Sequence, residues 1–523
     1  MANSQRAMLK MLSSRSSPIR SRNTYKPGLS LWWPQTPTSQ PEKNADTPPN
    51  LTDDDLIVTW DGQTDPSCPF NWSLTRRWAI TLLCSMGGMV TLMSASMLAP
   101  ALGSISTDLS ITESEANMVV SIFVLAFAFG PMALAPLAEV FGRRWVWILS
   151  STWYILWNTV CGFSHTRGLL LAGRILSGIG ASAEYAITTP VLADCWRAEQ
   201  RGQSFAIATF VPLLGPAIGP ILGGILTEKI GWRWLFWVLS IFDAVLVVYA
   251  ILFFPETYHR LLLHRKALRL QRETGRSYRG ESEVHAQPLL RKLGYSLARP
   301  CWMLATQPTI QIMAIFLAYN YGVLFLVLTS FASLWTDKYH QSVLISGVHY
   351  VAIVIGYTVA AQGGARITDW LWKYLTRKRG QTAPEYRIPL MIPGMVFLLA
   401  GLFWYGWAAD VMAPWIVVDI GAAVFGCGVI LCTQAMQQYV MESYRKYVAS
   451  ANASSQFLRS IFGFCFPIFA PALYDRLGYG WGNSTLAFIL IGFGVPAPFI
   501  IWVYGARLRA KGKQRAKGKV FLA

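Results

Sequence analysis

Twelve apolar runs dominate this sequence, and each is long enough to cross a bilayer as a helix. A spanning helix needs about 20 predominantly apolar residues. Only 14% of the residues are charged, whereas soluble proteins carry about 25%. This balance excludes a disordered chain and argues against a soluble one. The sequence therefore predicts an all-α polytopic membrane protein with 12 transmembrane helices. The runs are 78–99, 116–138, 145–163, 168–193, 203–226, 234–254, 309–334, 344–364, 388–408, 414–437, 448–473 and 484–504.

A long polar and basic stretch divides the runs into six plus six, so we expect two six-helix halves. The expected parts are a mostly disordered cytoplasmic tail at 1–77 with an interfacial anchor near 59–77, an N-terminal half at 78–254, a cytoplasmic central loop at 255–308, a C-terminal half at 309–505 and a basic cytoplasmic tail at 506–523.

The Lys and Arg residues fix the predicted orientation, because cytoplasmic loops are enriched in these cations. They collect in both terminal segments and in the even-numbered loops, while the odd-numbered loops are nearly bare of them. Both termini are therefore predicted to be cytoplasmic. The net charge of +18 needs no acidic partner beyond anionic lipid. The chain also lacks the soluble basic face that nucleic-acid binding requires.

The two halves echo each other. The fifth and eleventh runs both carry prolines four residues apart, then a short polar segment and an aromatic–glycine turn. Two six-helix halves of like design are typical of transporters, in which the substrate binds between the halves and rocking alternates the access.

The loop between the second and third runs reads APLAEVFGRRWVW, at 135–147. Gly142 permits a tight turn. Glu139 and Arg143 are four residues apart, near enough to pair if the helix continues. The alternative is that these charges only mark the membrane interface and set the topology.

Two further motifs lie inside apolar runs. LLLAGRILSGIGAS, at 169–182, places Arg174 within the fourth run; such an Arg is expected to face the bundle interior. GPAIGPILGG, at 215–224, repeats glycine every four residues, which gives one small-residue stripe for close helix contact. Its prolines each remove a backbone hydrogen bond, so we expect a kinked helix.

Together with the D-P-x-x-P-x-N-W element within 59–78, these motifs resemble the major facilitator superfamily. More narrowly, they resemble the twelve-span drug:proton antiporters of filamentous fungi. The resemblance implies a part in proton coupling for Arg174, with a structural Arg held by backbone carbonyls as the alternative. It further implies a conformational latch of Glu139, Gly142, Arg143 and Arg144, and an antiporter motif, found in exporters, of Gly215, Pro216, Gly219, Pro220, Gly223 and Gly224.

Three acidic residues within the runs, Glu184, Asp243 and Asp419, are functional candidates because ionisable groups inside a membrane are expensive. We expect Glu184 to carry the proton, and we hold Asp243 as a second candidate for coupling. The alternatives for Glu184 are recognition of a cationic substrate and a structural hydrogen bond. His349 is expected to be a helix-packing residue.

An apolar pocket with a few placed polar groups suits a drug-sized ligand. Polar and aromatic residues in the second half are therefore candidates for the substrate cavity, with interhelical hydrogen bonding as the alternative for each. They are Tyr319, Asn320, Tyr321, Gln434, Gln456 and Arg459. Asn483 begins an Asn-Ser-Thr sequon on the predicted outer side and is a glycosylation candidate.

The chain has no GxxxxGK[ST] sequence, which disfavours an ATP-driven pump. We expect no cofactor other than the proton gradient, no metal, and no enzymatic activity. The predicted function is proton-coupled efflux of small amphipathic molecules, such as a fungal secondary metabolite, toxin or drug, by a monomer in the plasma membrane. The alternatives are a carrier of a polyamine, siderophore or organic acid, and a non-transporting membrane sensor.

Overall fold

The computed structural model describes residues 56–62, 65–197, 204, 207–208, 210–212, 214–275, 278–280, 289–444 and 448–517. All of them belong to the unit Asp54–Ala523. The first 55 residues, predicted as mostly disordered, and the last six lie outside the described residues.

Helices of the N-terminal half begin where polar side chains cap them. Ser73 caps the first, Thr166 caps the fourth spanning helix, and Thr112 forms a reciprocal capping box with Glu115. The described helices of this half are α2 (Leu74–Ser96), η2 (Ala99–Ala101), α3 (Leu102–Leu109), α4 (Glu113–Val140), α5 (Arg143–Gly162), α6 (Arg167–Cys195), α8 (Gly215–Lys229) and α9 (Arg233–Phe253).

The C-terminal half repeats the plan with longer helices. Gly478 has a positive φ of 67°, which breaks α16 and separates the last two spanning helices. The helices are α12 (Pro308–Ser333), the π-helical turn η4 (Leu334–Lys338), α13 (Val343–Arg379), η5 (Pro384–Leu390), α14 (Met391–Asp410), α15 (Trp415–Ser443), α16 (Val448–Gly494) and α17 (Pro496–Lys517).

Within the described part of the chain, 8 segments are long and apolar enough to cross a membrane. The last of them, Ala451–Gly512, contains two crossings because it is broken at Gly478, so these segments supply nine. The other three are α5, α6 and α8, of which α8 has only 15 described helical residues. The all-α, twelve-helix architecture predicted from the sequence is thereby confirmed.

Lipid is the expected environment of the outer helix faces. On α9, for example, Ile241, Val245, Val248 and Leu252 are all exposed. Exposed apolar surface of this extent, repeated on most of the spanning helices, is found on membrane proteins rather than on soluble ones.

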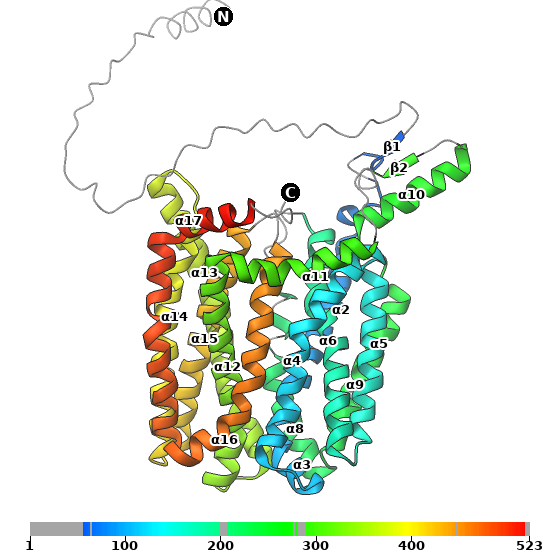
Figure 1. Ribbon diagram of the computed structural model, residues 1–523. Coiled ribbons are helices and arrows are strands. Elements are labelled where there is room, and N and C mark those ends of the chain that lie inside the picture. The colour runs from blue at the N-terminus through cyan, green and yellow to red at the C-terminus, as the bar shows by residue number, and fades with distance from the viewer. Residues whose placement is uncertain are drawn as a thin grey trace, which may run out of the picture. The chain divides into compact units, whose positions relative to one another are not determined.

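The segments outside the spans contain defined structure. Strand β1 (Leu56–Val58) pairs in parallel with β2 (Tyr278–Gly280), and α10 (His259–Thr274) packs beside both. Figure 1 shows these three elements together at one end of the helices. The short helix η1 (Pro69–Asn71) leads into α2, and α11 (Leu289–Thr306) leads into α12.

Among the described residues, the most extensive contacts between the two halves are those of α4 with α16 and of α8 with α13. In the first pair, the Asn117 amide donates to the carbonyl of Pro467 at 3.1 Å. In the second, a Cβ on Gly224 would stand 2.7 Å from the carbonyl oxygen of Val343, and one on Gly347 would overlap the carbonyl of Pro220. Glycine at both positions therefore permits the backbones of the halves to touch.

Candidate proton and substrate sites

Two buried carboxylates lie inside the N-terminal half. Glu184 on α6 and Asp243 on α9 are 4% and 1% exposed and interact electrostatically. The hydroxyl of Ser151 on α5 donates to one oxygen of Glu184 at 3.4 Å. Its other oxygen and both oxygens of Asp243 have no hydrogen-bond partner among the described residues. A Cβ on Gly87 would overlap the Glu184 carboxylate, so glycine on α2 makes room for it.

Arg174 is fully buried, and backbone oxygens supply most of its partners. Its guanidinium donates to the Val119 carbonyl at 3.1 Å, and to the Ser94 carbonyl and hydroxyl at 2.9 and 3.1 Å. It also stands 4.1 Å from the ring centre of Phe123. This arrangement matches the structural alternative for Arg174; its part in proton coupling stays a prediction.

Tyr154 on α5 connects these groups. It interacts electrostatically with both Arg174 and Asp243. Arg174, Tyr154, Asp243 and Glu184 are thus a set of buried residues linked by electrostatic interactions, which we call the polar chain. Tyr154 and Ser151 were not among the residues predicted from the sequence, although their spacing of three places them on one face of α5.

In the predicted latch, Arg143 pairs with a residue other than Glu139. The condition for a Glu139–Arg143 helical pair is not met, because α4 ends at Val140 and α5 begins at Arg143. Gly142 makes the turn with a φ of 94°. The Arg143 guanidinium instead lies 3.5 Å from a carboxylate oxygen of Asp194 at the end of α6.

Glu256, which follows α9, holds the start of α5. Its carboxylate accepts from the backbone N–H groups of Arg143 at 2.9 Å and Arg144 at 3.4 Å, and from those of Thr257 and Tyr258. The Arg144 guanidinium donates to the Ile251 carbonyl at 2.7 Å. A carboxylate at a helix N-terminus is stabilising. Arg143 and Arg144 therefore tie the start of α5 to the end of α6 and to α9. The sequence motif did not indicate Glu256 or Asp194.

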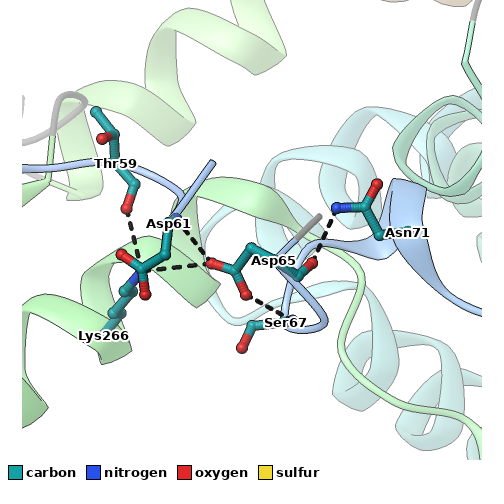
Figure 2. Close-up of polar contacts among 6 residues, drawn as sticks. All are labelled: Thr59, Asp61, Asp65, Ser67, Asn71 and Lys266. Carbon is teal, nitrogen blue, oxygen red and sulfur yellow. Dashed lines mark hydrogen bonds and ion pairs between the residues drawn. The ribbon is translucent and has the colours of Figure 1, made fainter. Parts of the chain in front are cut away.

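The D-P-x-x-P-x-N-W element forms a clasp with α10, drawn in Figure 2. Asp65 accepts from the N–H groups of Asp61 at 3.0 Å and Ser67 at 2.8 Å, and lies 3.4 Å from the Lys266 ammonium. Lys266 also binds the Asp61 carboxylate at 2.7 Å and the Thr59 carbonyl at 3.2 Å. Asn71 donates to the Asp65 carbonyl and accepts from Arg197 after α6. The segment before α2 is thereby fixed to the end of α6 and to α10.

The pKa of Asp65 is lowered from its usual value of 3.8. The N–H groups of Asp61 and Ser67 and the Lys266 ammonium lower this pKa, and burial of the carboxylate opposes them. Because the folded-state pKa is depressed, the stabilisation is present above about pH 4 and is lost as the pH falls through the lowered value. We expect Asp65→Ala to reduce the free energy of local opening of 56–72 by about 1–3 kcal/mol at pH 7, since partly buried donors lose a buried acceptor. Amide hydrogen exchange of that segment measures this.

Asp61→Ala is the matched control for the clasp, because its carboxylate binds the same Lys266 but is 80% exposed. An exposed pair contributes about 0–1 kcal/mol. Equal amide exchange rates in the two variants at pH 7 would contradict this account. So would a difference in exchange rate between wild type and Asp65→Ala that stays the same below about pH 4.

The glycine stripe of α8 packs on α2, as the spacing predicts. A Cβ on Gly215 would stand 2.9 Å from the Met89 carbonyl oxygen, one on Gly219 would stand 2.7 Å from the Ser96 hydroxyl, and one on Gly223 would overlap the Met97 carbonyl. Pro216 lies in the first turn of α8, where its missing N–H is tolerated, and Pro220 lies inside the helix.

Three of the six predicted cavity residues make interhelical hydrogen bonds. The Tyr319 hydroxyl donates to the Leu486 carbonyl at 2.8 Å, and the Gln434 amide donates to that of Ala361 at 3.4 Å. Asn320 donates to the Val429 carbonyl at 3.4 Å while its own oxygen, among the described residues, has no partner. Gln456 donates to a hydroxyl one turn away on its own helix.

Tyr321 and Arg459 are brought together at the junction of the halves. The guanidinium of Arg459 on α16 lies 3.9 Å from the ring centre of Tyr321 on α12. The same ring packs against Gly463, which is also next to Val124 of α4. The surroundings of this pair therefore include both halves.

Asn483 lies inside α16 and has no exposed surface. Its amide donates to the Tyr479 carbonyl at 2.9 Å, and its oxygen accepts from Tyr474 at 3.1 Å. A glycan on this nitrogen does not fit the folded arrangement, because the amide is packed against Gly406. The sequon alone carries no information on burial.

Several known proteins are similar to this chain. The model of the Major Facilitator Superfamily matches residues 84–467. The probable efflux pump mfs2 of Aspergillus flavus is 42% identical over 419 residues, covering 79% of this chain and 99% of the relative. The efflux pump vrtL of Penicillium aethiopicum is 40% identical over 487 residues, covering 92% and 94%.

Solved structures share the fold. A crystal structure of a D-xylose-proton symporter superposes with a TM-score of 0.60 at 16% identity, covering 81% of this chain and 97% of that one. The human organic anion transporter MFSD10 superposes with a TM-score of 0.56 at 15% identity, covering 82% and 100%. With its twelve helices, its two halves and its fungal relatives named as efflux pumps, the chain belongs to the Major Facilitator Superfamily and is a multi-pass membrane transporter.

Proposed function

We propose that this transporter exports small amphipathic molecules in exchange for protons. The observation that carries the proposal is the pair Glu184 and Asp243. Both carboxylates are buried, neither has an ion-pair partner among the described residues, and three of their four oxygens lack a hydrogen bond there. Burying an uncompensated carboxylate is costly, and binding a proton removes that cost.

The cost of burying these carboxylates couples proton binding to the conformation of the transporter. A ligand shifts a conformational equilibrium only by its differential affinity for the two states. In the arrangement seen here the carboxylates are enclosed, which favours their protonated forms. A conformation in which water reaches the two carboxylates favours release of the proton. Glu184 and Asp243 are then the coupling residues, while Arg174 orients the neighbouring helices through Ser94 and Val119.

The relatives named as efflux pumps support the proposed direction of transport. Side chains in the C-terminal half support the proposed class of cargo. Tyr321 offers an aromatic face and Arg459 a cation next to the contact between the halves, which suits a molecule with both apolar and polar parts. We place the protein in the plasma membrane as a monomer. Its partners are the bilayer and the small-molecule cargo, with the proton gradient as energy source, no bound cofactor and no nucleic acid.

Deleting the gene in its host and comparing small molecules inside and outside the cells by mass spectrometry identifies the cargo. The expected result is a compound that accumulates inside and falls in the medium. That compound is then loaded into liposomes containing the purified chain, and a pH gradient is imposed in either direction. Transport that ignores the gradient contradicts proton coupling. A polyamine, siderophore or organic acid as the accumulating compound replaces the cargo class proposed here.

A further inference from the structure

A second polar cluster lies in the C-terminal half, apart from the polar chain. His349 is the seventh residue of α13, and Asp419 is the fifth of α15. One ring nitrogen of His349 lies 2.8 Å from the Asp419 carboxylate, and the other lies 2.9 Å from the side-chain oxygen of Gln341. The side chains of His349 and Asp419 are 8% and 13% exposed.

Both ring nitrogens of His349 face acceptors. A neutral imidazole has one donor and one acceptor nitrogen, so it satisfies only one of these contacts, whereas the imidazolium donates at both positions. With the Gln341 oxygen toward the ring, this geometry suits a protonated ring paired with a carboxylate.

The aromatic surroundings favour the same charge state. The Trp335 ring stacks on His349 with centroids 3.7 Å apart and planes 9° apart, and Trp415 stands at 5.9 Å. A cation over the face of an indole is stabilised by the ring's electron density. Trp335 belongs to the π-helical turn η4, and such turns are often found at functional sites.

Few other charges reach this cluster. Tyr339, after η4, interacts electrostatically with Asp419. Lys338 is engaged by the backbone carbonyls of Ala409 and Asp410 at 3.0 and 3.2 Å. From the opposite half, Glu228 of α8 accepts from the N–H of Leu344 at the start of α13. Among the described groups, Asp419 is the charged side chain that contacts the ring.

We propose that His349 and Asp419 form a proton-binding site at the outer end of the C-terminal half. The site lies at the starts of α13 and α15, which follow loops that the distribution of Lys and Arg assigns to the outside. It is also two residues from Gly347, where α13 touches Pro220 of the other half. When His349 on α13 binds a proton, its ring links Asp419 on α15 to Gln341 in the loop after η4. This link lies next to the contact between the halves.

The protonation state is measured directly on the full chain in lipid nanodiscs. The sequence contains 6 histidines, so selective ¹³C and ¹⁵N labelling of histidine gives a spectrum in which His349→Gln removes one assigned signal. We expect that signal to be an imidazolium at pH 7, and to become neutral at the same pH in Asp419→Asn. His340→Gln is the matched control, because His340 is exposed in the adjacent loop. A neutral His349 ring in the wild type, or an unchanged ring in Asp419→Asn, overturns the proposal.

The effect on transport rests on the proposed function and is tested separately. In liposomes, we expect the efflux rate of the wild type to change with external pH, and His349→Gln to flatten that profile while His340→Gln leaves it intact. If no variant shows any dependence on protons, proton coupling fails but the spectroscopic result stands. If the profile of His349→Gln equals that of the wild type while Glu184→Gln changes it, the site has no role in transport and the inference is overturned.

Discussion

Glu184→Gln should abolish accumulation of cargo against its gradient while leaving the protein folded. Gln preserves the size of a protonated Glu but neither binds nor releases a proton. Linked sites typically couple by about 1–3 kcal/mol, so we expect the part of the transport rate that depends on the pH gradient to fall about 5- to 150-fold. The measurement compares gradient-driven efflux with substrate exchange at equal pH, in the same liposomes.

Exchange at equal pH separates coupling from folding. A variant that has lost only its proton carrier still exchanges cargo, because the alternating movement is intact. Asp243→Asn should weaken coupling in the same direction, since the two carboxylates interact. Glu113→Gln is the control, because Glu113 is exposed in the first turn of α4. Gradient-driven accumulation by Glu184→Gln at the wild-type rate would rule out Glu184 as the proton carrier.

The features that local pattern determines were predictable from the sequence. Hydrophobic length gave the spanning helices, and a spacing of four placed Gly215, Gly219 and Gly223 on the face of α8 that meets α2. The burial of Glu184 and Asp243 also followed, because ionisable groups within apolar runs turn inward. Each of these predictions uses residues of one helix only.

Partners across helices were not predictable. Arg143 and Glu139 have the spacing of a helical pair, yet the turn at Gly142 directs Arg143 to Asp194, and Glu256 arrives from more than a hundred residues away. His349 was expected to be a packing residue because nothing in its own segment reveals Asp419. A single sequence encodes which residues share a helix face, whereas contacts between helices depend on how all of them pack.

The glycine stripe predicts the second large effect, on stability. We expect Gly223→Ala to lower the thermal-unfolding midpoint, because its Cβ would overlap the backbone carbonyl of Met97 and a backbone atom cannot rotate away. Overpacking of this kind costs about 1–3 kcal/mol. The midpoint is measured in one detergent at a fixed scan rate, since membrane proteins often unfold irreversibly.

Gly492→Ala makes the same chemical change in α16 where an added Cβ meets no atom within 4 Å. Alanine favours helix by about 1 kcal/mol over glycine, so this variant should raise the midpoint or leave it unchanged. If Gly223→Ala lowers the midpoint while Gly492→Ala raises it, contact with α2, and not helix propensity, is the reason that position 223 requires glycine. If both variants shift the midpoint equally, the close approach of α2 and α8 does not contribute to stability. Loss of efflux by Gly223→Ala at temperatures where it stays folded would then indicate that the stripe serves the sliding of these helices during transport.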